Sequence, residues 1–275
     1  MTPAAISSTT NNNNQQQGYA LVNGLQLYYE IHGDGRPLLL LHGGGSTINS
    51  NFTYLLPILS AHYKVIAVEL QAHGRTPDRG TATSFEQDAD DAAGLLSYLG
   101  IKTAAVLGFS NGGSTALQLA IRHTAMVEQL VLISAMYKRS GLLPGFFEGM
   151  QHASLENMPA PLQEAFLLLK NDEQALQVMH DRDKNRMLAF QDWPDEYLQR
   201  ITAPTLLISG DKDVILPAHT LAMAALIPHS HVMILPGGHG AAINEICAAI
   251  PGSSLPAFTA SAIIEFLNNP TNAFS

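Results

Sequence analysis

The feature that most constrains the fold of this chain is residues 104–123, with the sequence AAVLGFSNGGSTALQLAIRH. An apolar run leads to a serine framed by glycines, Ser110 between Gly108 and Gly112, and a helical pattern follows. This order predicts a buried strand, a sharp turn and a helix. Glycine suits the turn because the serine backbone is forced into a strained conformation that leaves neighbouring side chains almost no room. A chain with 22 glycines can match G-x-S-x-G by chance, so the interpretation depends on what else the chain contains.

The predicted turn has a chemical consequence at Ser110 and Asn111. It lifts the Ser110 hydroxyl clear of the sheet edge. It also places the backbone N–H of Asn111 at the start of the helix, beside the point where negative charge develops on an attacked carbonyl. One loop is therefore predicted to supply a nucleophile and part of an oxyanion hole.

The rest of the chain alternates strand-like and helix-like segments, which predicts an α/β fold with a mostly parallel, right-handed wound sheet. Asn23-Gly24 separates YALVN from LQLYYEIHG and predicts a hairpin turn, so that an antiparallel pair opens the sheet. Uninterrupted apolar runs suit strands covered on both faces, and they recur as PLLLL, KVIAV, VEQLVLISA, TLLISG and HVMIL. Helical patterns lie at about residues 52–60, in SFEQDADDAAGLLSYLG, in PAHTLAMAALI and in LPAFTASAIIEFLNN.

These patterns divide the chain into four parts. Residues 1–17 are almost entirely polar and are predicted to form a disordered tail, because they offer little apolar surface to offset the entropy of ordering. Residues 18–135 and 201–275 form the two parts of the α/β core. Residues 136–200 contain no buried-strand pattern and are predicted to be a helical cap over the carboxyl edge of the sheet. Most of the large apolar residues of the cap belong to its core, but one or two should line a pocket: Phe146, Phe147, Met150, Phe166, Met187, Phe190 and Trp193.

Charge and composition exclude several classes of partner. A net charge of −9 argues against nucleic acid, because few cations are present to displace counterions. The longest apolar runs are too short to cross a membrane, and the N-terminus lacks the pattern of a secretion signal, so we expect a cytoplasmic protein with no membrane partner. The single cysteine, Cys247, cannot form an internal disulfide.

Neither a cofactor nor a metal is expected. HGGGS lacks the lysine of a P-loop and the spacing of a dinucleotide-binding loop, and no H-x-x-H or H-x-x-x-H pair suggests zinc. Four acids crowd the start of the helix capped by Ser84. We interpret them as solvated residues favoured by the helix dipole rather than as a metal site: Glu86, Asp88, Asp90 and Asp91.

A serine hydroxyl needs a base, usually an imidazole held by a carboxylate. Among eleven histidines, His239 stands out because it lies in PGGHGAA, just past the last predicted strand. The candidate acids lie in SGDKD, after the preceding strand, where Asp211 and Asp213 both remain possible. Because the carboxyl ends of parallel strands converge, these residues can meet Ser110 despite their separation in sequence.

At this point the chain resembles the α/β-hydrolase superfamily. GFSNGG is similar to its nucleophile elbow, HGGG to its oxyanion loop, and the order serine, acid, histidine is the order of that superfamily. The resemblance implies a central sheet of about eight strands with helices on both faces and a helical cap. It also implies Asp213 rather than Asp211 as the acid, and Gly44 as the second oxyanion donor with Gly45 as an adjacent candidate.

Two histidines near these motifs are interpreted as structural. His42 precedes the glycines of HGGG and is expected to brace that loop, and His73 lies in the turn of ELQAHGRT. In that segment Glu69 replaces the more common aspartate and Ala72 the more common glycine, so the resemblance does not extend to a subfamily.

By resemblance, we expect a serine hydrolase that cleaves carboxylic esters of small, largely apolar molecules through an acyl-enzyme. Serine at the elbow sets the chain apart from haloalkane dehalogenases and epoxide hydrolases. The alternatives are a carbon-carbon bond hydrolase acting on vinylogous diketo acids, a lactonase, a cofactor-free perhydrolase, a proline-type aminopeptidase, or a non-catalytic ligand receptor. The sequence leaves the oligomeric state open.

Charged residues of the cap bear on two of these alternatives. An aminopeptidase needs a cap carboxylate to hold the substrate amine, and the available acids are Glu148, Glu156, Glu164, Asp181 and Asp183. A basic cap would favour acidic substrates, but we interpret Arg182, Lys184 and Arg186 as a solvated helix face.

Overall fold

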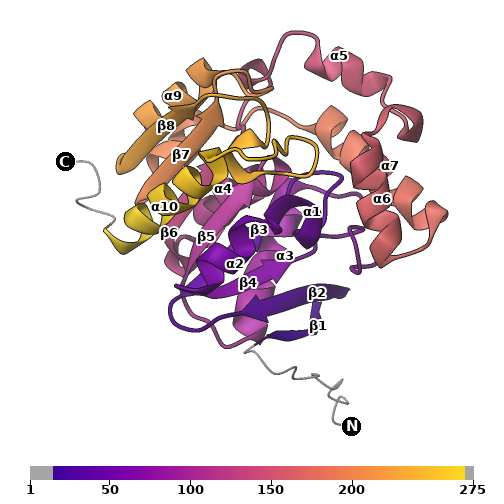
Figure 1. Cartoon of the computed structure of the whole chain (residues 1–275), viewed down its shortest axis with the longest axis horizontal. Coiled ribbons are helices and arrows are strands. Elements are labelled where there is room, and N and C mark those ends of the chain that lie inside the picture. The colour runs from indigo at the N-terminus through magenta and orange to yellow at the C-terminus, as the bar shows by residue number, and fades with distance from the viewer. Residues whose placement is uncertain (1–14, 270–275) are drawn as a thin grey trace.

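The computed structural model describes residues 15–269 and is organised around one eight-stranded sheet, which confirms the predicted fold class (Figure 1). The strand order is β1-β2-β4-β3-β5-β6-β7-β8. β2 pairs with β1 and β4 in antiparallel fashion, and the remaining pairs are parallel. The strands are β1 (Gln16–Val22), β2 (Leu25–His32), β3 (Pro37–Leu41), β4 (Lys64–Val68), β5 (Ala104–Phe109), β6 (Val127–Ile133), β7 (Thr205–Gly210) and β8 (Ser230–Leu235).

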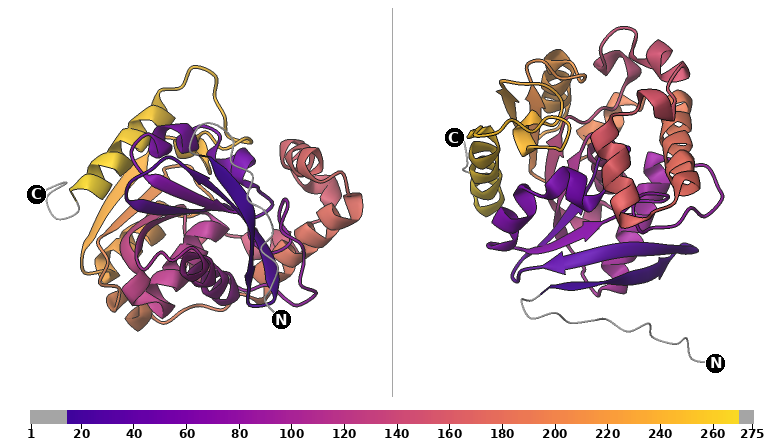
Figure 2. Two further views of the ribbon diagram at one scale, coloured as in Figure 1. Left: turned by 90° about the horizontal axis from the view of Figure 1, so that it is seen from below. Right: turned by 45° about the vertical axis from the view of Figure 1, so that its right-hand side comes forward.

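Helices cover both faces of the sheet because the central strands are apolar on both sides (Figure 2). Alternate side chains of β3 show the division: Leu39 and Leu41 belong to one core cluster, and Leu38 and Leu40 to the other. The first cluster lies under α3 (Phe85–Tyr98), α4 (Asn111–Arg122) and α9 (Pro217–Leu226). The second lies under α1 (Ile48–Phe52), α2 (Leu55–Ser60) and α10 (Leu255–Asn268).

Two local predictions require correction. The polar tail was expected to reach residue 17, but β1 begins at Gln16, since Gln16 and Gln17 pair with Ile31 and Glu30 of β2. Backbone pairing with β2 and a hydrogen bond from the Tyr28 hydroxyl to Gln17 Oε1 order these residues. Residues 1–14 of the predicted tail lie outside the described residues. The single helix expected at residues 52–60 is two short helices, α1 and α2, with Thr53 and Tyr54 between them. The Asn23-Gly24 hairpin turn is confirmed, with φ of 47° and 78°.

Between β6 and β7 the chain forms helices, in the segment predicted as a cap. They are α5 (Phe146–Gln151), α6 (Ala160–Leu169), α7 (Glu173–Ala189) and α8 (Asp195–Gln199). In Figure 1, α6 and α7 lie to the right of the strands, and the left view of Figure 2 shows the same segments set apart from the sheet. None of the helices in residues 15–269 is long and apolar enough to cross a membrane.

The acids of α3 are less solvated than predicted. Asp88 and Asp91 are each only 1% exposed, and they pair with Arg186 and Arg79. Glu86 and Asp90 are partly exposed; Glu86 accepts a hydrogen bond from Trp193 Nε1 at 3.2 Å, and Asp90 pairs with Arg122. The acids therefore hold neighbouring segments to α3. The prediction of a fully solvated cluster was wrong, because the cap helix α7, through Arg186, and the loop after β4, through Arg79, both cover α3.

Candidate active site

Ser110 lies in a strained turn between β5 and α4. Its φ of 55° is in the left-handed region, which non-glycine residues rarely adopt. The flanking glycines are required by packing: a Cβ on Gly108 would lie 2.1 Å from the carbonyl oxygen of Gly112, and one on Gly112 would lie 2.1 Å from that of Leu41. Glycine at positions 108 and 112 therefore lets β3, β5 and α4 approach so closely at this serine, where any side chain would collide with backbone.

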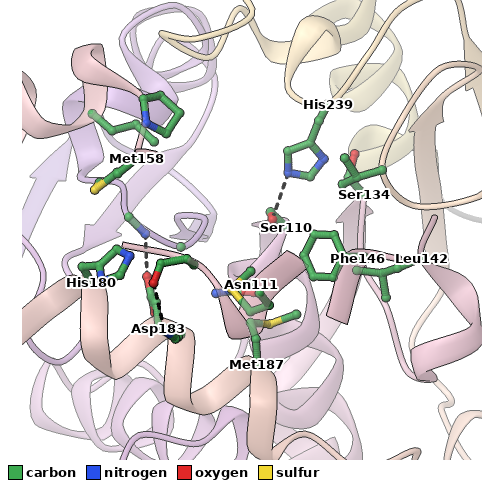
Figure 3. A pocket seen from close by; sticks show the side chains of 18 of the residues that line it. Ser110, Asn111, Ser134, Leu142, Phe146, Met158, His180, Asp183, Met187 and His239 are labelled. Atoms are coloured by element: carbon green, nitrogen blue, oxygen red, sulfur yellow. Dashed lines mark hydrogen bonds between the residues drawn. The ribbon is translucent and has the colours of Figure 1, made fainter. Parts of the chain in front are cut away.

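The structure brings Ser110, His239 and Asp213 together. His239 Nε2 lies 3.0 Å from Ser110 Oγ, and His239 Nδ1 lies 2.7 Å from Asp213 Oδ1 (Figure 3). Asp211 points elsewhere, since its Oδ1 accepts a hydrogen bond from the backbone N–H of Gly237. An imidazole held between a hydroxyl and a carboxylate can remove the serine proton and return it to a leaving group.

The Asp213 carboxylate is buried and fully occupied by donors. Its Oδ1 also accepts the backbone N–H of Ile215 at 3.1 Å, and its Oδ2 accepts the hydroxyl of Ser134 at 2.5 Å. Burial by itself raises the pKa of Asp213, but the hydrogen bonds from His239 and Ser134 outweigh it and lower the pKa below its ordinary value. Asp213 therefore stays ionised at neutral pH.

Sequence reasoning missed Ser134, which has a strained φ of 53° and lines the same cavity as Ser110. Its position at the carboxyl end of β6 was the signal that could have found it. The end of each parallel strand reaches the same edge of the sheet, so a polar residue there is a candidate neighbour of the site.

The two predicted oxyanion donors line one cavity with Ser110, and neither N–H has an acceptor within residues 15–269. In the HGGG loop the flanking amides are occupied: Gly43 N–H donates to Asn51 Oδ1 at 2.6 Å, and Gly45 N–H donates to Asp183 Oδ2 at 2.5 Å. Gly44 is thus the residue of this loop whose N–H remains available, and Gly45 is not.

His42 braces this loop, as predicted for a structural role. Its Nε2 accepts the backbone N–H of Leu70 at 3.0 Å, and its Nδ1 lies 2.8 Å from the carbonyl oxygen of Gly43, to which it donates. Burial, reinforced by the neighbouring charge on His73, lowers the pKa of His42 to about 3. A neutral imidazole with one donor and one acceptor nitrogen matches both partners.

The site opens into a cavity of about 360 Å³ between the sheet edge and the helices of residues 136–200. Its walls are largely apolar, with Leu142, Phe146, Met158 and Met187 around Ser110 (Figure 3). One or two of the large apolar residues named for this segment were expected to line a pocket, and three of them do: Phe146, Met150 and Met187.

The charged residues of α7 differ from the predicted solvated face. Arg186 is buried and pairs with Asp88 and Asp183, and Arg182 pairs with Asp78. Lys184 lines the cavity, where its Nζ donates to the carbonyl oxygen of Ala153 at 2.8 Å. Of the five acids considered for holding a substrate amine, Asp183 is the one that lines this cavity, and its carboxylate is already occupied. No sequence signal distinguished Asp183 from the acids around it.

Comparison with known proteins identifies a family model, curated relatives and solved structures that resemble this chain. Residues 38–245 match the model of the Alpha/beta hydrolase family. The Magnesium-chelatase 30 kDa subunit of Rhodobacter capsulatus is 32% identical over 244 residues, which cover 78% of this chain and 84% of that protein. The human Serine hydrolase BPHL is 30% identical over 230 residues, covering 79% and 77%. The crystal structure of a serine hydrolase involved in carbazole degradation, the CarC enzyme, superposes with a TM-score of 0.75 at 23% identity, covering 92% of this chain and 98% of the other.

Proposed function

Since this chain belongs to the alpha/beta hydrolase family and is a hydrolase, we propose that it cleaves carboxylic esters of small, largely apolar molecules through an acyl-enzyme. The observation that carries the proposal is the continuous chain of contacts from Ser110 through His239 to Asp213 at the end of an apolar cavity. A buried, ionised carboxylate at the end of that chain stabilises the imidazolium that forms during the reaction.

In the proposed mechanism His239 Nε2 accepts the Ser110 proton as Oγ attacks the ester carbonyl. The N–H groups of Gly44 and Asn111 stabilise the oxyanion of the tetrahedral intermediate. His239 then gives its proton to the departing alkoxide, which leaves as the alcohol. Water, deprotonated by His239, attacks the acyl-enzyme, and collapse of the second tetrahedral intermediate releases the acid and restores Ser110.

The contacts of two charged residues that line the cavity, Asp183 and Lys184, help to decide between two alternative functions, aminopeptidase and carbon-carbon bond hydrolase. The aminopeptidase alternative is disfavoured, because Asp183 already accepts from Gly45 and is paired with two cations. Carbon-carbon bond hydrolysis of diketo acids is the second candidate, and Lys184 favours it. Lys184 lines the cavity, and the acceptor of its ammonium is the neutral carbonyl of Ala153, another lining residue, so the ammonium is a candidate partner for a substrate carboxylate.

The test is a panel of esters, lactones, amides and diketo acids assayed with wild type and Ser110→Ala. We expect burst release of p-nitrophenol from its acetate and labelling of Ser110 by a fluorophosphonate, with both lost in the variant. His239→Ala should also lose labelling. A wild-type protein that neither releases p-nitrophenol above buffer nor reacts with the probe would support the receptor alternative and refute the proposal.

A further inference from the structure

The Asp183 carboxylate joins the cap helix α7 to the oxyanion loop of the core. Its Oδ2 accepts the backbone N–H of Gly45 at 2.5 Å (Figure 3). The same oxygen accepts Nε2–H of His73 at 2.9 Å. Its Oδ1 accepts from Arg186, one turn further along α7, and Arg186 in turn reaches Asp88 of α3. A single side chain of α7 is therefore bound to two loops and, through Arg186, to a helix of the core.

The charges around Asp183 are balanced. His73 is completely buried, with a carboxylate at Nε2 and the carbonyl oxygen of Gln71 at 2.9 Å from Nδ1. Because both partners are acceptors, both ring nitrogens donate and the ring is an imidazolium. Burial lowers the pKa of His73, but the Asp183 carboxylate outweighs burial and raises it. Two cations, His73 and Arg186, thus neutralise Asp183 and Asp88.

This neutrality matters because Asp183 lies beside the point where an oxyanion would form. A Cβ built on Gly44 would lie 3.0 Å from Asp183 Oδ2. An uncompensated carboxylate at that place would oppose a developing negative charge. The pairing with His73 and Arg186 allows a carboxylate to serve as a hydrogen-bond acceptor here without that penalty.

The backbone contact gives Asp183 a role in the geometry of the loop. Three consecutive glycines have more backbone freedom than any other sequence, so their conformation depends on external anchors. Gly43 N–H is held by Asn51 of the core, and Gly45 N–H is held by Asp183 of the cap. The free N–H of Gly44 lies between these two anchored amides.

We propose that Asp183 is a positioning residue for the oxyanion hole, and that Gly44 N–H takes its productive orientation only while α7 is docked on the core. The proposal rests on the serine hydrolase function proposed above. Removal of the anchor should therefore lower the rate of the step in which the oxyanion forms, while binding of small esters in the apolar cavity changes little.

The experiment compares Asp183→Ala and Asp183→Asn with Asp78→Asn. The last variant weakens the Asp78–Arg182 ion pair, which also joins α7 to the core but does not touch the oxyanion loop. The measurements are the second-order rate constant for phosphonylation by a fluorophosphonate, and kcat and KM for p-nitrophenyl acetate. Both probes require an oxyanion hole, and the first requires no knowledge of the natural substrate.

For Asp183→Ala we expect the phosphonylation constant and kcat to fall about 10- to 100-fold with KM changed less than about threefold, as for other small displacements of catalytic groups. Asp183→Asn keeps an amide oxygen that can accept Gly45 N–H and should recover part of both rates. It is nearly isosteric, so it also serves if Asp183→Ala does not fold. Asp78→Asn should stay near wild type.

Three outcomes would overturn the proposal: unchanged rates in both Asp183 variants, a change confined to KM, or equal losses in Asp183→Asn and Asp78→Asn. Phosphonylation of wild type distinguishes failure of the serine hydrolase function from failure of the positioning role of Asp183. If wild type itself is not phosphonylated, the serine hydrolase function fails and the positioning role fails with it. If wild type and the Asp183 variants react at one rate, only the positioning role fails.

Discussion

Replacement of Asp213 by asparagine tests how this structure sets the tautomer of His239. Asp213 Oδ1 accepts His239 Nδ1–H at 2.7 Å and the backbone N–H of Ile215 at 3.1 Å. Oδ2 accepts the rotatable hydroxyl of Ser134 at 2.5 Å and, at the longer distance of 3.4 Å, the backbone N–H of Gly210. An asparagine amide that turned its NH₂ toward Ile215 would meet that closer fixed donor at 3.1 Å, whereas the fixed donor at the other position, Gly210 N–H, is 3.4 Å away. We therefore expect its oxygen to keep the Oδ1 position and its NH₂ to face Ser134, whose hydroxyl can turn to accept.

In that orientation His239 keeps its proton on Nδ1, and the variant loses only the negative charge that stabilises the imidazolium. A hydrogen bond to a charged group contributes about 1.5–3 kcal/mol, which corresponds to a loss of roughly 10- to 150-fold in kcat. Asp213→Ala removes the acceptor as well and leaves the Ile215 N–H and Ser134 hydroxyl unpaired. Deletion of a triad aspartate in another serine hydrolase lowered kcat about 3 × 10⁴-fold, and we expect a similar loss here.

The assay is steady-state hydrolysis of p-nitrophenyl acetate, together with the phosphonylation rate, for both variants and for Asp211→Asn. Asp211 is the exposed neighbour that accepts from Gly237, and its variant should stay within about fivefold of wild type because a neutral hydrogen bond is worth about 1 kcal/mol. An Asp213→Asn variant as inactive as Asp213→Ala would refute the reasoning, since it would show that the Ile215 N–H does not set the orientation of the amide.

Three further predictions follow from other contacts. Ser110→Ala should lower ester hydrolysis by on the order of 10⁶-fold, measured by active-site-titrated kinetics. Gly108→Ala should lower the free energy of unfolding by at least about 1–3 kcal/mol in urea titrations, because its Cβ would strike the Gly112 carbonyl, whereas Gly149→Ala in α5 meets no atom within 4 Å and should change it by less than about 1 kcal/mol. The Asp183 carboxylate raises the pKa of His73, so the stabilisation of the folded state by protonated His73 is full below the unfolded pKa of about 6.5 and is lost as pH rises through the folded pKa. In urea titrations at several pH values, the difference in free energy of unfolding between wild type and Asp183→Asn should therefore shrink above pH 6.5, by at most about 1.4 kcal/mol per pH unit.

The sequence by itself determined the features that depend on near neighbours. Gly108 and Gly112 specify the elbow around Ser110 because only glycine fits the close approach of strand and helix. Asn23-Gly24 specifies the hairpin because both residues tolerate positive φ, and the apolar runs specify the central strands because both faces are buried. The order of Ser110 and His239 at strand ends also followed from local patterns, since parallel strands end at one edge.

The tertiary structure alone decided which charges meet across the boundary between cap and core. Asp183 lies 138 residues from Gly45 and 110 from His73, and nothing around it in sequence distinguishes it from Asp181. Its role, the burial of Asp88 and Arg186, and the engagement of Gly45 all depend on how α7 sits against the core. Local patterns encode whether a backbone segment is buried and how it turns. The partner of a buried charge is set by the packing of distant elements, which no single stretch of sequence contains.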